Sequence, residues 1–316
     1  MATNSGPSIS LKEFKGSQEE KIVRQIFQDI KRHEIGIRKL LASNPSTTSK
    51  DTQIMTGLAH HLFSQLVPNN KYEVDKYAKQ LPKTCGCGCN GDIYGGDTSI
   101  GSPGTWHGRV DILVNHTIAV AIGKEPPVSA EEEESEEQEP QNKQRKVELE
   151  NNCDICGEVK GNKRHDSVLL DLKFLNQILA EAITNGFAQV NRNQSTLSHF
   201  LIPTFGATSD HVSICLYDPE NDCLLHIDDE FKLWSDIRYK LDRETIIIIW
   251  LFLNFTIFTK KNLASAANLK KSGLHKDLNE DLQYYKKTKV KAKFVLRTPE
   301  RRPWKRTTIQ VKHPNT

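Results

Sequence analysis

The sequence lacks the signals that mark several classes of protein. Its most apolar run, residues 246–258, is about two thirds of the length that crosses a bilayer and contains Asn254 and Thr256. We therefore expect a buried element there and no association with a membrane. The first ten residues show neither a basic start nor an apolar run, so we expect no secretory signal and an intracellular protein, nuclear or cytoplasmic.

Other absences argue against nucleotide-binding folds and against a disulfide scaffold. The sequence has no P-loop, no dinucleotide-binding glycine pattern and no internal repeat. Its seven cysteines are an odd number, which does not suggest a complete set of disulfide bonds. A reducing compartment would leave these cysteines as thiols.

The cysteines do form two short motifs that contain glycine, Cys85-Gly-Cys87-Gly-Cys89 and Cys153-Asp-Ile-Cys156-Gly. The second is typical of half a zinc knuckle, because its glycine permits the turn that aims backbone amides at sulfur. We predict that Zn²⁺ binds Cys87, Cys89, Cys153 and Cys156, with Cys85 able to replace one of the first pair. The alternative is two unrelated turns that carry free thiols.

The charge of the chain, +3 overall, is strongly segregated. Residues 131–139 contain seven glutamates, and we expect a disordered acidic insertion at about 126–149, either a solvated loop or a mimic of nucleic acid. Residues 286–316 carry eleven Lys or Arg and one Glu, with interleaved aromatic residues. This basic tail suits phosphate contacts and base stacking, with a disordered or nuclear-targeting tail as the alternative. The predicted nucleic-acid contacts are Lys286, Lys287, Arg301, Arg302, Trp304 and Arg306.

Acidic residues and a lysine lie on predicted strands after residue 104. Residues 104–114 are predicted as a strand containing Asp111, residues 117–122 as a second strand of the same hairpin, and residues 157–160 as a third. Glu158 and Lys160 share one face, and share it with Asp111 if the strands pair. Two converging carboxylates repel each other unless a hard cation such as Mg²⁺ or Mn²⁺ lies between them. Such a metal activates water and a nearby lysine adds positive charge, which suits phosphodiester hydrolysis.

This pattern resembles the PD-(D/E)XK, or restriction-endonuclease-like, nuclease superfamily over roughly residues 50–260. The matching residues are Gly108, Asp111, Glu158 and Lys160, followed by a helix that carries Gln177. The resemblance implies a core of a helix, a strand hairpin, a third strand, a helix and further strands. It also implies that Asp111 and Glu158 bind the metal, that Lys160 assists, and that Gln177 supports the site as a glutamine does in many exonuclease-like members.

A second candidate motif is Asp171-x-Lys173, which follows an apolar run. However, Leu172, Leu175 and Leu179 fall at helical spacing, which places this motif on a helix with Asp166 or Ser167 as its N-cap. We therefore prefer Glu158 and Lys160 as the site residues.

Periodicity predicts the remaining elements. We expect one helix at residues 19–41 or two that divide near Gly36, a helix at 51–66 and a helix at 234–261. Strands are predicted at 200–206, 212–218 and 223–227, and a polar helix or loop at 264–285. His60 and His61 lie on the second helix, where we expect core or surface histidines, with a contribution to the active site as the minority alternative.

The sequence thus predicts an α/β (α+β) protein with a mixed central β-sheet flanked by helices, restriction-endonuclease-like, with N-terminal helices and a basic C-terminal tail. Residues 1–49 form a lead and a helix, residues 50–285 a nuclease-like domain, and residues 286–316 the tail. Three functions stay open: a Mg²⁺-dependent nuclease acting on DNA or RNA, an inactive module of the same fold that binds nucleic acid or protein, and a zinc-stabilised interaction protein. The sequence does not determine the oligomeric state.

Overall fold

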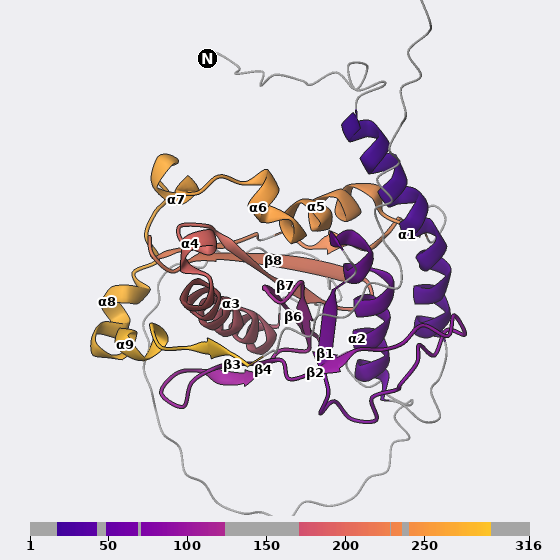
Figure 1. Cartoon of the computed structure of the whole chain (residues 1–316), viewed down its shortest axis with the longest axis horizontal. Coiled ribbons are helices and arrows are strands. Elements are labelled where there is room, and N and C mark those ends of the chain that lie inside the picture. The colour runs from indigo at the N-terminus through magenta and orange to yellow at the C-terminus, as the bar shows by residue number, and fades with distance from the viewer. Residues whose placement is uncertain are drawn as a thin grey trace, which may run out of the picture.

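The computed structural model describes residues 18–42, 49–68, 71–123, 171–227, 229–235 and 240–291 (Figure 1). The acidic insertion, the predicted site residues Glu158 and Lys160, the predicted zinc ligands Cys153 and Cys156, and the tail after residue 291 lie outside these ranges.

Two helices precede the sheet. Helix α1 (Gln18–Ala42) is continuous through Gly36, so the chain forms one helix here and not two. Helix α2 (Lys50–His61) begins after Ser49, whose side chain accepts a hydrogen bond from Thr52 N at 3.3 Å, and the 3-10 helix η1 (Phe63–Leu66) follows it. The predicted helix at 51–66 is therefore an α-helix up to His61, followed by a 3-10 helix up to Leu66.

The central sheet combines strands from both halves of the chain. Its order is β10-β8-β7-β6-β5-β1-β2, and β9 also pairs with β8. Strand β5 runs antiparallel to β1 and β6, β6 and β7 run parallel, and β8 runs antiparallel to β7. The strands are β1 (Tyr72–Asp75), β2 (Gly95–Gly96), β5 (Ile112–Val114), β6 (Ile118–Ile122), β7 (Ile202–Ala207), β8 (His211–Asp218), β9 (Cys223–His226) and β10 (Phe231–Lys232). The prediction of a mixed central sheet is confirmed.

The predicted strand at 104–114 is wrong as a single element. It divides into β4 (His107–Arg109) and β5, with Val110 and Asp111 between them. Strand β4 leaves the central sheet and pairs with β3 (Ser99–Gly101), which pairs in turn with β13 (Lys289–Val290). Strands β5 and β6 do form the predicted hairpin, and its turn residues Asn115 and His116 have φ of 49° and 57°.

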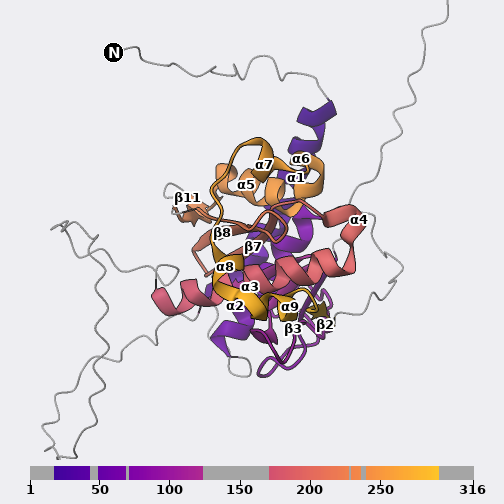
Figure 2. The same ribbon diagram turned by 90° about the vertical axis from the view of Figure 1, so that its left-hand side faces the viewer.

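Helices cover both faces of the sheet (Figure 1). Helix α3 (Leu172–Arg192) connects toward β7 and packs Phe174, Ile178 and Ala182 against one face. The opposite face packs against α2 and α1 in the main hydrophobic core. Figure 2 shows α3 side-on with the short helix α9 (Leu282–Tyr285) beside it. The described part of the chain is thus a mixed α+β structure with a mixed central sheet flanked by helices.

The C-terminal elements are shorter than predicted. Within the predicted helix at 234–261 the chain forms β11 (Trp234–Ser235), β12 (Lys240–Leu241), α5 (Arg243–Leu253) and α6 (Phe255–Phe258). Helix α5 begins at its N-cap Asp242, which accepts a hydrogen bond from Thr245 N at 2.9 Å. Short helices follow, namely α7 (Leu263–Ala266), α8 (Leu274–Leu278), η4 (Asn279–Asp281) and α9. Among the described helices, none has the length and apolar character needed to cross a membrane.

Candidate metal centre

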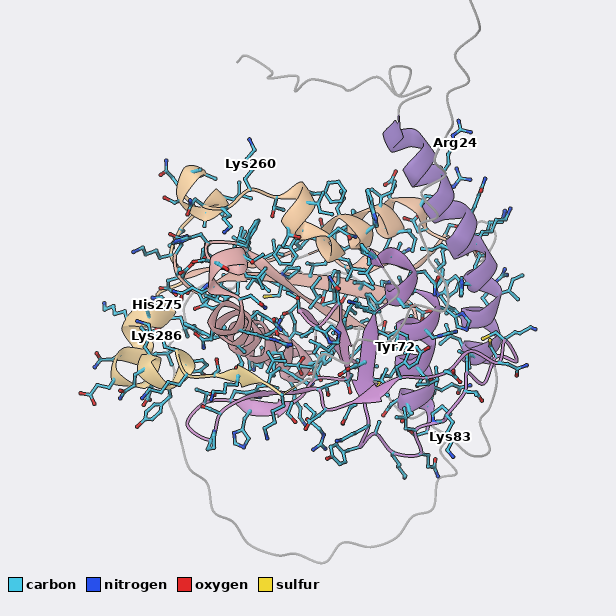
Figure 3. The ribbon with its side chains drawn as sticks, viewed as in Figure 1. Arg24, Tyr72, Lys83, Lys260, His275 and Lys286 are labelled. Carbon is cyan, nitrogen blue, oxygen red and sulfur yellow. The ribbon has the colours of Figure 1, made fainter. Side chains whose placement is uncertain are left out.

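The segment from Cys85 to Cys89 forms a short closed loop. Thr84 and Asp92 pair across its base, and Cys85 N donates to Gly91 O at 2.8 Å. Gly88 has φ of +86°, a left-handed conformation that glycine adopts without steric cost. Figure 3 shows Lys83, which precedes this loop, near the lower end of α2. Two cysteines of this loop, Cys85 and Cys87, contact His61 at the C-terminal end of α2.

His61 and three cysteines converge there. We call the side chains of His61, Cys85, Cys87 and Cys89 the Cys3His cluster; one donor atom from each lies within 4.8 Å of all the others. His61 Nε2 lies 3.1 Å from Cys85 Sγ, 3.2 Å from Cys87 Sγ and 4.0 Å from Cys89 Sγ. His61 and Cys85 are buried, whereas Cys89 is exposed. These four residues could hold a metal ion.

The ring of His61 is held from behind by helix α1. His61 Nδ1 lies 2.9 Å from His33 Nδ1, which leaves Nε2 facing the sulfurs. A Cβ built on Gly36 would lie 2.5 Å from His61 Cε1, so only glycine allows α1 to pass this close. The neighbouring His60 Nε2 lies 3.7 Å from Cys89 Sγ, while its Nδ1 lies 3.2 Å from the Tyr72 hydroxyl.

The electrostatics of the Cys3His cluster suit a cation. Burial first, and then the rings of His60 and His33, lower the pKa of His61 to about 3, so its imidazole is neutral near pH 7. Burial also raises the pKa of Cys85 and that of Cys87 above the usual value for a thiol. A metal binds neutral imidazole and thiolate, and its positive charge favours the loss of thiol protons.

The structure therefore contains part of the predicted zinc site, as a group of residues that could hold a metal. The structure brings Cys87 and Cys89 together, as predicted, and adds Cys85 to them. His61, expected to be a core or surface histidine, supplies the fourth donor. Cys153 and Cys156 lie outside the described residues. The signal available in the sequence was a histidine pair near the end of a helix that shortly precedes the cysteine motif.

A second group of polar side chains lies on the opposite side of the hairpin from α2. Asp111 stands at the break between β4 and β5, and its Oδ2 accepts a hydrogen bond from Ile122 N at 2.7 Å. Across the sheet face, Glu181 of α3 is completely buried, and its Oε1 accepts a hydrogen bond from Gln177 Nε2 at 2.9 Å. Among the described residues, none donates a hydrogen bond to Glu181 Oε2. We call Asp111 and Glu181 the acidic pair.

The pKa of Glu181 reports this environment. Burial raises it to about 8, the hydrogen bond from Gln177 opposes the rise, and the charge of Asp111 adds to it. Glu181 is therefore largely protonated near pH 7 when nothing positive is bound beside it. A buried carboxyl oxygen without a donor, close to a second acid, is where a cation would be stabilised.

The other residues predicted for the nuclease site, and those of the second candidate motif, lie on α3, at its N-cap or outside the described residues. Gln177 is an exposed residue of α3 that donates a hydrogen bond to Glu181, and its supporting role stays a prediction. Asp171 is the N-cap of α3, accepting from Lys173 N at 3.2 Å, so the predicted caps Asp166 and Ser167 are wrong. Asp171 and Lys173 are exposed at the start of this helix and do not belong to a strand, as the helical spacing predicts. Glu158 and Lys160 lie outside the described residues.

Two of the predicted nucleic-acid contacts, Lys286 and Lys287, belong to the described residues. Lys286 and Lys287 are exposed after α9, and Figure 3 shows Lys286 on the far side of the molecule from Lys83. The predicted tail contacts Arg301, Arg302, Trp304 and Arg306 lie outside the described residues. A groove of about 430 Å³ between α1 and α5 forms a separate basic surface. Its charged lining residues are Arg24, Lys31, Glu34, Lys240 and Arg243.

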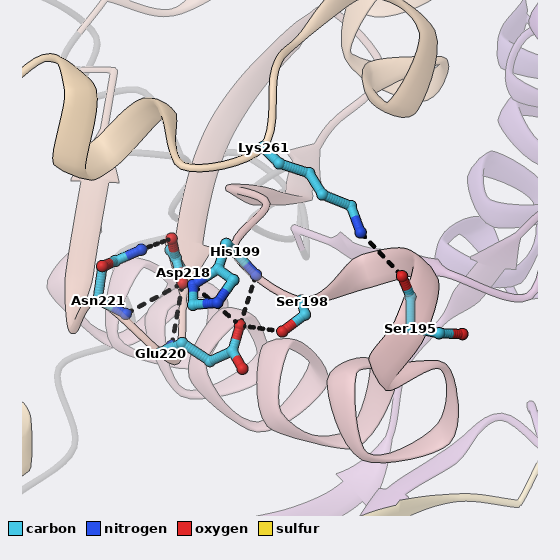
Figure 4. Close-up of polar contacts among 7 residues, drawn as sticks. All are labelled: Ser195, Ser198, His199, Asp218, Glu220, Asn221 and Lys261. Carbon is cyan, nitrogen blue, oxygen red and sulfur yellow. Dashed lines mark hydrogen bonds and ion pairs between the residues drawn. The ribbon is translucent and has the colours of Figure 1, made fainter.

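A serine, a histidine and a glutamate meet near the turn between β8 and β9 (Figure 4). Glu220 Oε2 accepts hydrogen bonds from the Ser198 hydroxyl and from His199 N, both at 2.5 Å, and lies 3.3 Å from His199 Nδ1. A nucleophilic serine donates its hydrogen bond to a base such as histidine, whereas Ser198 donates directly to the carboxylate. This group therefore fastens the chain after α4 (Gln194–Leu197) to the turn and is not a catalytic triad.

The Cys3His cluster offers soft donors to a cation, and the acidic pair offers hard ones. No protein-family model, curated protein or solved structure matches the chain.

Proposed function

We propose that this chain is a divalent-metal-dependent nuclease of the PD-(D/E)XK type that hydrolyses phosphodiester bonds in DNA or RNA. The observation that carries the proposal is the acidic pair, in which a buried Glu181 oxygen without a hydrogen-bond donor lies close enough to Asp111 for the two charges to interact. The proposed partner of Asp111 is therefore Glu181, alongside the prediction of Glu158.

The order of elements supports the proposal. A helix (α2), a strand and a hairpin (β1, β5 and β6), a second helix (α3) and further strands (β7 and β8) follow one another along the chain. The core that the resemblance implies has a third strand after the hairpin; the predicted one, at 157–160, lies outside the described residues. Asp111 directly precedes β5, and Glu181 projects from the helix that covers the same sheet.

The residues of the acidic pair fit Mg²⁺ or Mn²⁺, which take carboxylate oxygens. When bound, such an ion lowers the pKa of a coordinated water and offsets negative charge on the phosphate. The Ile122 N–H orients the Asp111 carboxylate, and the Gln177 amide holds Glu181 Oε1, which leaves Oε2 for the cation. The resemblance implies a lysine that assists the metal. Lys160 is the predicted lysine, and Lys124, two residues after the end of β6 in the sequence, is a second candidate.

A cleavage assay tests the proposal. The full chain is incubated with Mg²⁺ or Mn²⁺ and with single- and double-stranded DNA and RNA. We expect Asp111→Asn and Glu181→Gln to lower cleavage by roughly 100-fold or more, the scale of removing one electrostatic interaction with a transition state. Glu244→Gln, which changes an exposed acid of α5, is the matched control and should keep wild-type activity.

Variants at Glu158, Lys160 and Lys124 complete the assay. Cleavage that survives Glu181→Gln and is abolished in Glu158→Gln would remove Glu181 from the site and favour the sequence-based pair. Loss of cleavage in Lys160→Ala but not in Lys124→Ala would assign the lysine role to Lys160, and the reverse would assign it to Lys124.

One observation favours the second candidate function, an inactive module of the same fold that binds nucleic acid or protein. Glu181 has no exposed surface, and its raised pKa keeps it neutral without a metal, as a purely structural carboxylic acid would be. Binding of nucleic acid without cleavage in either metal would select this alternative over the nuclease.

A further inference from the structure

We propose that the Cys3His cluster is a closed structural zinc site that ties helices α1 and α2 to the edge of the central sheet. The proposal is independent of the nuclease assignment, because the cluster shares no residue with the acidic pair. It differs from the sequence-based prediction in its ligands, with His61 and Cys85 in place of Cys153 and Cys156.

The donor set selects the metal. Three thiolates and one imidazole are soft to intermediate ligands, which suit Zn²⁺ and do not suit Mg²⁺ or Ca²⁺. A tetrahedral zinc with its usual bond lengths requires about 3.6 Å between nitrogen and sulfur and about 3.8 Å between sulfurs. The three observed distances from His61 Nε2 to sulfur, 3.1, 3.2 and 4.0 Å, lie around that value. Small shifts of the side chains are enough to admit the ion.

Two neighbouring groups, His33 and the Gly91 N–H, contact the proposed zinc ligands. A zinc-bound histidine usually makes a hydrogen bond through its other ring nitrogen, which sets its tautomer and orientation. His33 provides that contact to His61 Nδ1. Gly91 N lies 3.4 Å from Cys89 Sγ and donates to it, which is the backbone contact that stabilises a thiolate. His33 is therefore a positioning residue and not a ligand.

Four protein donors leave no open coordination position, which is the property of a structural site. His61 belongs to the end of α2, and the cysteine loop continues through Ile93 and Tyr94 to strand β2. Tyr94 O accepts a hydrogen bond from Val74 N in β1. The ion would thus join the helix layer to the β1–β2 edge of the sheet. It would bond to His61 on one side and to cysteines at least 24 residues further along the chain on the other.

Metal analysis of the purified full-length chain is the first test. We expect one zinc per chain, bound to three sulfurs at about 2.3 Å and one nitrogen at about 2.0–2.1 Å by X-ray absorption. This measurement needs no variant, so it stands even if a ligand substitution prevents folding. A chain without zinc, or with a disulfide between the cysteines of the loop, would overturn the proposal.

Matched variants identify the ligands. His61→Ala and Cys85→Ser should lose most of the bound zinc, whereas His60→Ala and Cys223→Ser, which change a neighbouring histidine and a buried cysteine elsewhere, should retain one zinc per chain. The double variant Cys153→Ser/Cys156→Ser should also retain it. Retention of zinc in His61→Ala, or its loss in the double variant, would contradict the ligand set.

His33 gives a finer readout. His33→Ala should still bind one zinc at saturation but with an affinity lowered by roughly 10–100-fold, as measured by competition with a chelator. An affinity equal to that of the wild type would remove the positioning role of His33.

Discussion

Glu181 is a single residue whose protonation couples folding to pH. Its pKa in the folded chain, about 8, exceeds the ordinary value of 4.5. Between these values the folded chain holds a proton that the unfolded chain has released, so the free energy of unfolding falls as pH rises. One such proton contributes a slope of roughly 1.4 kcal/mol per pH unit. Glu181→Gln, neutral at every pH, should remove this slope.

Urea unfolding across this pH window, without added magnesium, measures the effect. Glu181→Gln should gain stability over the wild type toward the alkaline end, while the control Glu244→Gln should follow the wild type. Parallel curves for Glu181→Gln and wild type would mean that Glu181 is not buried in its neutral form.

Individual site residues differed in how far the sequence could predict them. Asp111 was predicted because an acid after a glycine and before an apolar run is a local pattern. Glu181 was within reach, since it lies on the same stripe of α3 as Phe174 and Ile178 and is an acid on a buried face. His61 belongs to a histidine pair at the end of a predicted helix, but its role as a fourth donor could not be predicted. Its partners are 24 and more residues away, and the direction of its ring depends on how α1 crosses α2.

At the scale of elements, the crossing of α1 and α2 controls the Cys3His cluster. A side chain at Gly36 would overlap the ring of His61, which His33 and the cysteines hold in place. Gly36→Ala should therefore weaken zinc binding, although alanine favours a helix over glycine by roughly 1 kcal/mol. Zinc affinity by chelator competition is the measurement, and Ile35→Ala, an exposed neighbour on α1, is the control. Equal affinities would show that the close approach is not required.

Some local elements were predicted well, whereas the predicted strand at 104–114 and the predicted helix at 234–261 each divide into shorter elements. The β5–β6 hairpin follows from two apolar runs around Asn115 and His116, which have positive φ angles and belong to the three-residue loop between the paired Val114 and Ile118. Helix α3 follows from its 3.6-residue period. The break between β4 and β5 could not be predicted. Strand β4 pairs with β3 and not with the central sheet, and β3 pairs in turn with β13 at residues 289–290, far along the chain.

At the scale of the whole molecule, the basic tail is the feature that bears on partners. Lys289 and Val290 belong to β13, so a deletion that keeps this strand begins at residue 292. If the tail binds phosphates, deleting residues 292–316 should weaken nucleic-acid binding. The log–log salt slope should then fall by roughly 0.7–0.9 for each phosphate that the shortened chain no longer neutralises. Binding isotherms over a range of salt concentrations measure both quantities.

The basic groove between α1 and α5 provides the comparison. The double variant Lys240→Ala/Arg243→Ala removes charge from that groove without touching the tail. A salt slope that falls only in this variant would move the phosphate-binding residues to the groove. If neither change alters affinity or slope, the tail keeps only its targeting or disordered interpretation.

The spacing of the cluster also bears on how the chain reaches its fold. Three of the four donors lie within one short loop, whereas His61 joins them across 24 residues. If the cluster binds zinc as proposed, its three cysteines would also offer the denatured chain a partial site, and zinc held there would lower the net stabilisation that binding gives the native state. Capturing His61 would then require the closure of only one loop, whose entropic cost grows slowly with its length.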